Sequence, residues 1–201
     1  MAVSERLADG KSGGAFQPAG NITRADMADY LVMGTEIRQF LPIDGGSLFT
    51  DVTTSQAPFA EAVGVPGAAL RDWFFAQGAV ELPATATRFN PSSQVKRWEL
   101  AYALVQALGL QAQAPQLNGQ AVTTVYNGQR IPVDDSSKIP AGYEGYVQLA
   151  LDLSILNASF SFTQGPYDLV PAIHANFQPT KLTTRADYAV AATRWLTAWL
   201  Q

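Results

Sequence analysis

Three arginines occupy equivalent places in three similar segments, and a guanidinium group is well suited to binding a carboxylate. Arg24, Arg97 and Arg185 each follow a phenylalanine by eight residues. We expect each in the first turn of a helix, where the helix dipole disfavours a cation and an acid two residues on does not face it. Each arginine therefore needs another partner. That partner is either a carboxylate or carbonyl in a neighbouring segment, or an anionic ligand at the helix start.

The residues before the arginines predict how the helices begin. Thr23 and Thr184 are good N-cap residues, whereas Lys96 cannot accept the same backbone hydrogen bonds. An acid stands three positions after each threonine, Asp26 and Asp187, and each pair predicts a capping box. Glu99 stands at the same place after Lys96. Capping alone accounts for the threonines and the acids, so the arginines are the residues that need a further explanation.

Catalytic chemistry has little support in the sequence. The single histidine, His174, stands in an expected loop, and without cysteine it cannot build a multi-histidine metal site. Asp134 and Asp135 are adjacent acids that suit calcium or glycosidic chemistry, but a turn-forming role is preferred. We therefore expect no enzyme activity, no metal and no cofactor.

Composition narrows the partners. The chain has 201 residues, a net charge of −4 and only 15% charged residues, with no run of basic residues. A nucleic-acid partner is not expected, because binding phosphates needs a basic surface. No stretch is apolar enough to span a membrane, and the N-terminus lacks a signal-peptide core. If the protein works outside the cell, we expect this chain to be part of a longer precursor.

An internal repeat organises the chain. Residues 16–32, 89–105 and 177–193 superpose without gaps as FQPAGNITRADMADYLV, FNPSSQVKRWELAYALV and FQPTKLTTRADYAVAAT. We name these the three F-x-P segments. In each, the phenylalanine is expected to be a buried anchor, the proline to fix an extended entry, and the apolar spacing to form an amphipathic helix.

A weaker repeat precedes the second and third F-x-P segments. An apolar–acid turn at 49–52 leads through a loop to an expected helix at 69–80, and another at 133–135 leads to one at 145–156. Gly78 and Ser154 occupy comparable helix-end positions. The first segment lacks such a leading half, apart from a Gly-rich stretch from Asp9 to Gly14.

The remaining segments are expected to form one hairpin and several loops. The Asn118-Gly and Asn127-Gly turns predict a small β-hairpin within residues 111–130. Residues 83–88 and 158–176 are expected to be irregular loops. At least two of Trp73, Phe74 and Phe75 are expected in the core. Trp98, Trp195 and Trp199 are expected to pack rather than bind sugars.

These features resemble the repeat units of the S-layer homology family. The resemblance rests on Phe49-Thr-Asp51, Gln77-Gly-Ala-Val80, Phe16-Gln-Pro18 and Ile22-Thr-Arg-Ala-Asp26 and covers roughly residues 9–201. It implies a mainly α fold, a pseudo-threefold assembly of helix-loop-helix units with a small β-hairpin and long loops. The expected organisation is a tail at 1–15, the end of a truncated unit, and a single body at 16–201. Its units lie at about 16–45, 46–112 and 131–201.

The resemblance also implies a function. Such modules bind an acidic, pyruvylated secondary cell-wall polysaccharide and anchor a larger secreted or surface protein, so it places this chain at the cell surface. Carried across by position, the ligand-binding residues are Arg24, Arg97 and Arg185 with Thr23, Lys96 and Thr184. The drift of the second and third motifs leaves an alternative open. In it, the chain is a protein–protein, self-assembly or docking domain of a secreted enzyme such as a protease, without glycan binding.

Overall fold

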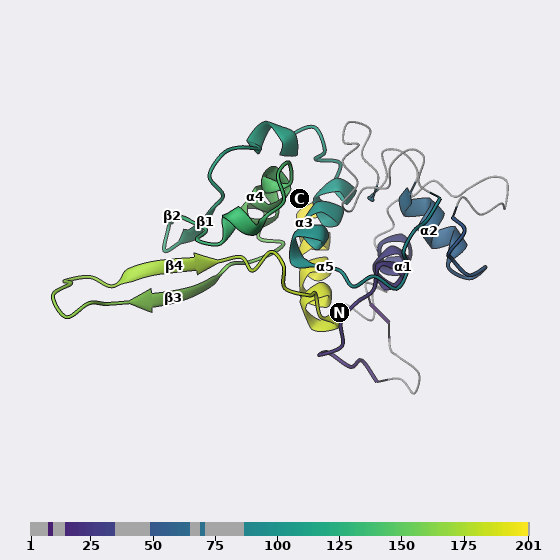
Figure 1. Ribbon diagram of the computed structural model, residues 1–201, viewed down its shortest axis with the longest axis horizontal. Coiled ribbons are helices and arrows are strands. Elements are labelled where there is room, and N and C mark those ends of the chain that lie inside the picture. Colours follow the sequence, from purple (N-terminus) through teal and green to yellow (C-terminus); the bar gives the residue numbers. More distant parts are fainter. Residues whose placement is uncertain (1–7, 10–14, 35–48, 65–68, 71–86, 201) are drawn as a thin grey trace.

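The computed structural model describes residues 8–9, 15–34, 49–64, 69–70 and 87–200 (Figure 1). Helices dominate these residues, so the mainly α expectation holds for them. The helices are α1 (Arg24–Gly34), α2 (Ala57–Gly64), α3 (Arg97–Ala107), α4 (Glu144–Asp152) and α5 (Arg185–Trp199), with short 3-10 turns η1 (Ala114–Leu117) and η2 (Ser136–Lys138). The strands are β1 (Thr123–Tyr126), β2 (Gln129–Pro132), β3 (Ser159–Thr163) and β4 (Ala172–Asn176). No helix in the described ranges is long and apolar enough to cross a membrane.

The middle residue of each F-x-P motif has a left-handed backbone. Its φ is 50° at Gln17, 57° at Asn90 and 59° at Gln178. In the second and third segments an upstream carboxylate stabilises this bend, because it accepts hydrogen bonds from two successive backbone N–H groups. Asp135 accepts from Phe177 and Gln178, both at 2.8 Å. Asp51 does the same for Phe89 at 2.7 Å and Asn90 at 2.8 Å. The preferred turn-forming role of the acid at 135 is therefore confirmed.

The helix starts follow the predicted capping pattern. The Thr23 hydroxyl accepts from the Asp26 N–H at 3.1 Å, and the Asp26 carboxylate accepts from the Thr23 N–H at 2.9 Å. The Thr184 and Asp187 pair makes the same reciprocal bonds. At the second start, the backbone N–H of Lys96 donates to Glu99 at 2.8 Å. The helices α1, α3 and α5 thus begin where the sequence predicts.

Backbone hydrogen bonds join the three F-x-P segments in a closed ring. The Ile22 N–H donates to the Thr183 carbonyl at 3.0 Å, Thr183 donates to Val95 at 2.8 Å, and Val95 donates back to Ile22 at 3.2 Å. The first residue of each of α1, α3 and α5 also donates to a neighbouring segment: Arg24 to Ser93, Arg97 to Lys181 and Arg185 to Gly20. The helix starts are therefore held together by main-chain contacts between segments far apart in sequence.

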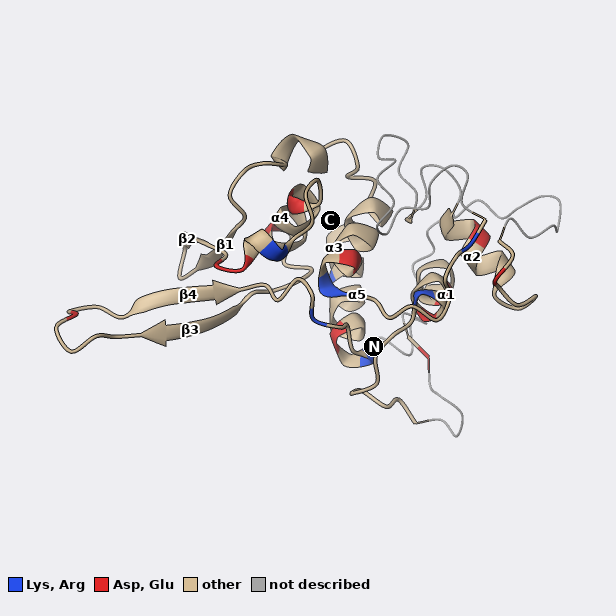
Figure 2. Cartoon of the chain, viewed as in Figure 1, with Lys and Arg blue, Asp and Glu red and all other residues tan. Residues whose placement is uncertain are grey.

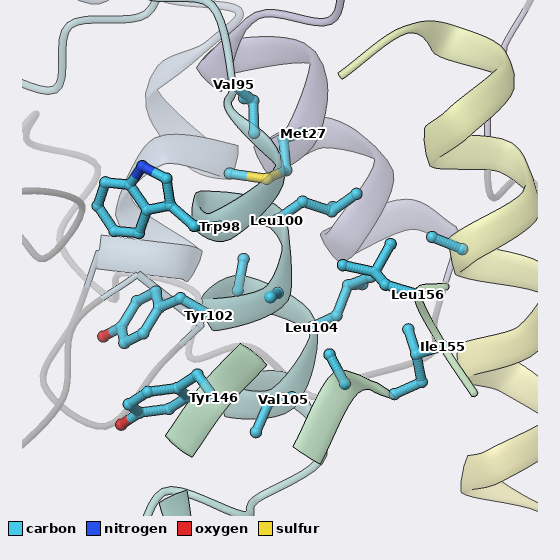
Figure 3. Close-up of a cluster of buried hydrophobic side chains, with 14 of the residues drawn as sticks. Met27, Val95, Trp98, Leu100, Tyr102, Leu104, Val105, Tyr146, Ile155 and Leu156 are labelled. Atoms are coloured by element: carbon cyan, nitrogen blue, oxygen red, sulfur yellow. The ribbon is translucent and has the colours of Figure 1, made fainter. Parts of the chain in front are cut away.

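Helix α3 lies at the centre of the core. Its residues from Leu100 to Val105 are fully buried, and Tyr102 packs edge-on against Tyr146 of α4 (Figure 3). The Trp195 indole donates to the Leu104 carbonyl at 2.9 Å, which ties α5 to α3. Packing is confirmed for Trp98 and Trp195, both buried. Trp199 stacks on Trp195 but remains 53% exposed, so it is only partly a packing residue.

The predicted hairpin is present at the Asn127-Gly128 turn, and its second strand extends two residues past the predicted limit of 130. Strands β1 and β2 pair antiparallel from Thr123↔Pro132 to Tyr126↔Gln129. Asn127 and Gly128 form the turn with φ of 47° and 79°. Two successive left-handed residues are the requirement of a type I′ turn, which explains why Asn-Gly predicts it.

Three sequence expectations need correction. Residues 158–176 are not an irregular loop, because β3 and β4 pair from Ser159↔Asn176 to Thr163↔Ala172 and extend outward as an arm (Figure 1). His174 therefore lies on a strand. Residues 57–64, expected within a loop, form α2, which packs against α1. Helix α4 ends at Asp152 rather than at 156, with Ser154 left-handed at φ 56° as its predicted position implies.

Some expectations fall where the structure gives no description. Most of the helix expected at 69–80 lies outside the described residues, as do Trp73, Phe74, Phe75 and Gly78. The same holds for residues 10–14 of the Gly-rich stretch and for residues 83–86 of the first expected loop.

Candidate functional site

Each of the three arginines stacks on the phenylalanine of another F-x-P segment. The guanidinium carbon of Arg97 lies 5.0 Å from the centroid of the Phe177 ring. The corresponding distances are 5.3 Å from Arg24 to Phe89 and 5.1 Å from Arg185 to Phe16. A cation this close to an aromatic face is attracted to it. The arginines therefore have a structural partner that the spacing within one segment could not reveal.

The side chain of Arg185 is buried, and its hydrogen bonds go to other parts of the chain. Its side chain is 1% exposed, and Nε donates to the Phe16 carbonyl at 2.7 Å. Nη1 donates to the Tyr30 hydroxyl, and Nη2 donates to the Asp9 carbonyl. Tyr30 in turn donates to the Asp9 carboxylate at 2.6 Å. This network fastens the start of α5 to α1 and to the chain before the first F-x-P segment.

Arg97 is more accessible than Arg185 and lies on the wall of a groove. Its Nε donates to the Phe177 carbonyl at 2.9 Å and its Nη2 to the Asn157 carbonyl at 2.7 Å. Partial burial lowers the pKa of Arg97, while Asp187 and Asp135 act in the opposite direction. No hydrogen bond from Nη1 is found within the described part of the chain. This nitrogen therefore keeps donors for a further acceptor.

The groove runs along the outer face of α5, and we call it the α5 groove. It encloses about 270 Å³ between α5 and the segment that follows α4. Its walls combine two arginines with an acid, an amide and apolar side chains: Arg97, Arg194, Asp187, Asn157, Ala186, Val190, Ala191, Ile155 and Leu156. Asn157 and Arg194 also line an adjoining hollow of about 540 Å³ that reaches Asp152 and Thr197. Together the two hollows offer space of the size that small-molecule sites use.

Arg194 is the site residue that sequence reasoning missed. It lies on α5 at helical spacing from Asp187 and Ala191, so the three share one face. Within the described residues it has neither a salt bridge nor a hydrogen bond through its side chain. Charged residues are sparse over the described part of the chain (Figure 2). A signal existed: no other F-x-P segment has an arginine nine residues after the motif arginine.

A second groove, between α1 and α2, has the opposite character. It encloses about 250 Å³, and its charged lining residues are Asp26 and Asp29, beside Ser55, Gln56 and Phe59. Burial raises the pKa of Asp29, and the nearby Asp9 and Asp26 raise it further. Such a site opposes an anionic ligand. We call it the α1 groove.

The other candidates have mainly local roles. Thr23 and Thr184 cap helices, while Lys96 is exposed and its backbone bridges to Leu182. His174 Nδ1 lies 2.9 Å from Asp134 Oδ2, and its Nε2 lies 2.9 Å from the Thr163 hydroxyl. In the described ranges no group of three or more His, Cys, Asp or Glu residues could hold a metal ion.

The first part of the chain is similar to a known protein family. Residues 1–28 match the model of the S-layer homology domain. The match includes the first F-x-P motif and the helix start at Thr23–Asp26. S-layer homology domains generally anchor proteins to cell-wall polysaccharide and are typically non-catalytic, which supports a cell-surface association. No curated protein matches the chain.

Proposed function

We propose that this chain is a non-catalytic module that anchors a larger surface or secreted protein by binding an acidic, pyruvylated cell-wall polysaccharide. The match of residues 1–28 to the S-layer homology domain supports cell-wall anchoring. The observation that carries the acidic specificity is the pair of arginines in the α5 groove, Arg97 and Arg194.

The proposed architecture is a pseudo-threefold assembly of three units in one body. It is supported by the closed ring of hydrogen bonds among Ile22, Val95 and Thr183. The three arginine–phenylalanine stacks support it as well, because each joins a different pair of F-x-P segments. In this arrangement grooves lie between units, where side chains from two segments can contact one ligand.

The α5 groove suits the proposed ligand chemically. A pyruvate ketal presents a carboxylate on a sugar ring, and a guanidinium binds a carboxylate with charge-assisted hydrogen bonds. Asn157 and Asp187 supply acceptors and an amide for sugar hydroxyls, while Val190 and Ala191 give an apolar surface for the ring. We assign the carboxylate to the space between Arg97 and Arg194. The α1 groove, with two aspartates, is not assigned this ligand.

The other residues expected to bind ligand are not assigned to the α5 groove. Ligand binding by Arg24, Arg185, Thr23, Lys96 and Thr184 stays a prediction. The contacts of Arg185 within the protein account for its position without a ligand. The α5 groove is therefore the place where the function is best tested.

Calorimetric titration with purified pyruvylated wall polysaccharide tests the proposal. The variant is Arg194→Gln, because the Arg194 side chain makes no hydrogen bond or salt bridge within the described residues. Loss of one charge-assisted contact costs about 1.5–3 kcal/mol, so we expect affinity to fall roughly 10- to 150-fold. Arg88→Gln is the matched control, because Arg88 is exposed and lies outside the α5 groove. It should bind like the unsubstituted chain.

The glycan provides the second half of the experiment. Removing the pyruvyl group should weaken binding to the unsubstituted chain. Arg194→Gln should then bind the depyruvylated glycan about as well as the unsubstituted chain does. The proposal fails if the unsubstituted chain does not bind the polysaccharide. The assignment of the carboxylate to the α5 groove fails if Arg194→Gln and Arg88→Gln bind equally well.

A further inference from the structure

The β3–β4 arm has one open edge. The edge of the arm formed by β4 is occupied, because Ala175 of β4 forms a bridge with Val133, the residue that follows β2. The Asp134 N–H donates to the Ala175 carbonyl at 2.8 Å there. All five residues of β3 are exposed, and within the described residues no other strand pairs with β3. The free edge of this sheet is therefore β3.

The hydrogen-bond pattern tells which backbone groups that edge presents. The Ala175 carbonyl points away from β3, toward Asp134, so the pair Phe160↔Ala175 is one that does not exchange hydrogen bonds. In an antiparallel ladder such pairs alternate with bonded ones. The N–H and C=O groups of Phe160 and Phe162 consequently point outward, with Ser161 between them facing β4.

This edge lacks the usual protection against pairing. Natural edge strands are blunted by lysine, proline, bulges or a covering element. The sequence of β3 is Ser-Phe-Ser-Phe-Thr, with neither charge nor proline, and its register with β4 is continuous. An uncharged strand can also face a second copy of itself without repulsion between like charges.

We propose that β3 pairs antiparallel with β3 of a second copy of this chain, with Ser161 on the twofold axis. Phe160 then lies opposite the partner's Phe162, and Phe162 opposite the partner's Phe160. Each of these pairs exchanges two backbone hydrogen bonds, because their N–H and C=O groups point outward. The two arms become one continuous sheet.

The side chains favour the same register. Phe160 and Phe162 lie on one face of β3, where Tyr126 packs on both at centroid distances of 5.0 and 5.7 Å. Pairing through Ser161 sets two aromatic cross-strand pairs side by side on that face, and such pairs stabilise sheets. The exposed apolar surface of Phe162 thereby gains a partner.

Cysteine crosslinking tests the register, because the chain contains no cysteine. In the proposed dimer of Ser161→Cys, the two cysteines stand directly opposite each other and form a cross-strand pair that does not exchange backbone hydrogen bonds. Their Cα atoms would lie about 4.5 Å apart, which permits a disulfide. The control is Ser159→Cys, whose two copies would stand roughly 13 Å apart. Under mild oxidation we expect a covalent dimer from Ser161→Cys and none from Ser159→Cys.

Charge substitutions at the same residue test the association itself. Sedimentation of the unsubstituted chain should show a concentration-dependent dimer, and Ser161→Lys or Ser161→Glu should each be monomeric. An equimolar mixture of the two should dimerise again, because opposite charges then meet. A chain that stays monomeric throughout would overturn the proposal. So would equal crosslinking of Ser161→Cys and Ser159→Cys, or dimers that both charged variants leave intact.

Discussion

Asp135 is the residue whose loss should most directly weaken the third F-x-P segment. The residue is 9% exposed, and its carboxylate accepts from the N–H groups of Phe177 and Gln178, both at 2.8 Å. A hydrogen bond to a charged group contributes about 1.5–3 kcal/mol. Phe177 is buried, so its N–H would lose its partner, whereas water can replace the carboxylate at the exposed Gln178. We therefore expect Asp135→Ala, which removes both acceptors, to cost about 3 kcal/mol.

The neighbouring Asp134 supplies a matched control. Asp134→Ala removes the same side chain one residue away, and that side chain is 40% exposed. We expect it to cost less than about 1 kcal/mol, as exposed ion pairs do. For a domain of this size, a loss of 3 kcal/mol lowers Tm by roughly 6–12 °C. Thermal unfolding followed by circular dichroism measures both variants. Equal shifts for the two substitutions would refute the role given to the carboxylate at 135.

Two further predictions concern local packing and pH dependence. A Cβ at Gly145 would lie 1.8 Å from the Ala114 carbonyl oxygen, so Gly145→Ala should lose about 3 kcal/mol in urea unfolding, as overpacking does. Gly119→Ala has open space and should lose only about 1 kcal/mol from its φ of +76°; similar losses would contradict the clash. Although burial acts to raise it, the N–H groups of Phe89 and Asn90 hold the pKa of Asp51 below its usual range. A lowered folded-state pKa stabilises the protein above the unfolded value near 4, and this is lost as pH falls through the folded value. The stability gap between Asp51→Asn and the unsubstituted chain should therefore shrink between pH 7 and pH 3, and a constant gap in urea unfolding would contradict this.

Local signals in the sequence predict the helix starts and one hairpin correctly. The Thr-x-x-Asp boxes at 23–26 and 184–187 need only four consecutive residues to form, and Asn127-Gly128 needs only two. Because these motifs satisfy their own backbone groups, distant residues do not change the outcome. The three helix starts are therefore the most predictable part of the fold.

Elements that depend on distant partners were missed. Helix α2 has only eight residues with Pro58 in its first turn, and short helices are stabilised mainly by packing, here against α1. The alternation Ser-Phe-Ser-Phe in β3 is a strand signal. Residues 164–171 separate it from β4. This connection contains Gly165-Pro166, which marks a turn, but it is longer than the common hairpin loops of two to five residues.

The site was predictable in part for the same reason. The repeat identifies the arginine column, but the partner of each arginine is a phenylalanine in another segment, far along the chain. Neither the burial of Arg185 nor the two arginines that share the α5 groove follow from spacing within one segment. Arg194 lies one residue beyond the aligned columns, so its signal is a difference from the other two segments and not a part of the repeat.

The charges that distinguish the α1 groove from the α5 groove come from residues that the three segments do not share. Nine residues after the motif arginine stand Met33, Gln106 and Arg194, so only the third segment places a cation there. Five residues after it stand Asp29 in α1 and Val190 in α5, one on each groove wall. The shared arginine and phenylalanine columns hold the segments together, and they impose the same contact in all three. Because that contact does not depend on the outer helix faces, those faces are free to differ. An acidic α1 groove and an arginine-lined α5 groove can therefore coexist on one repeated scaffold.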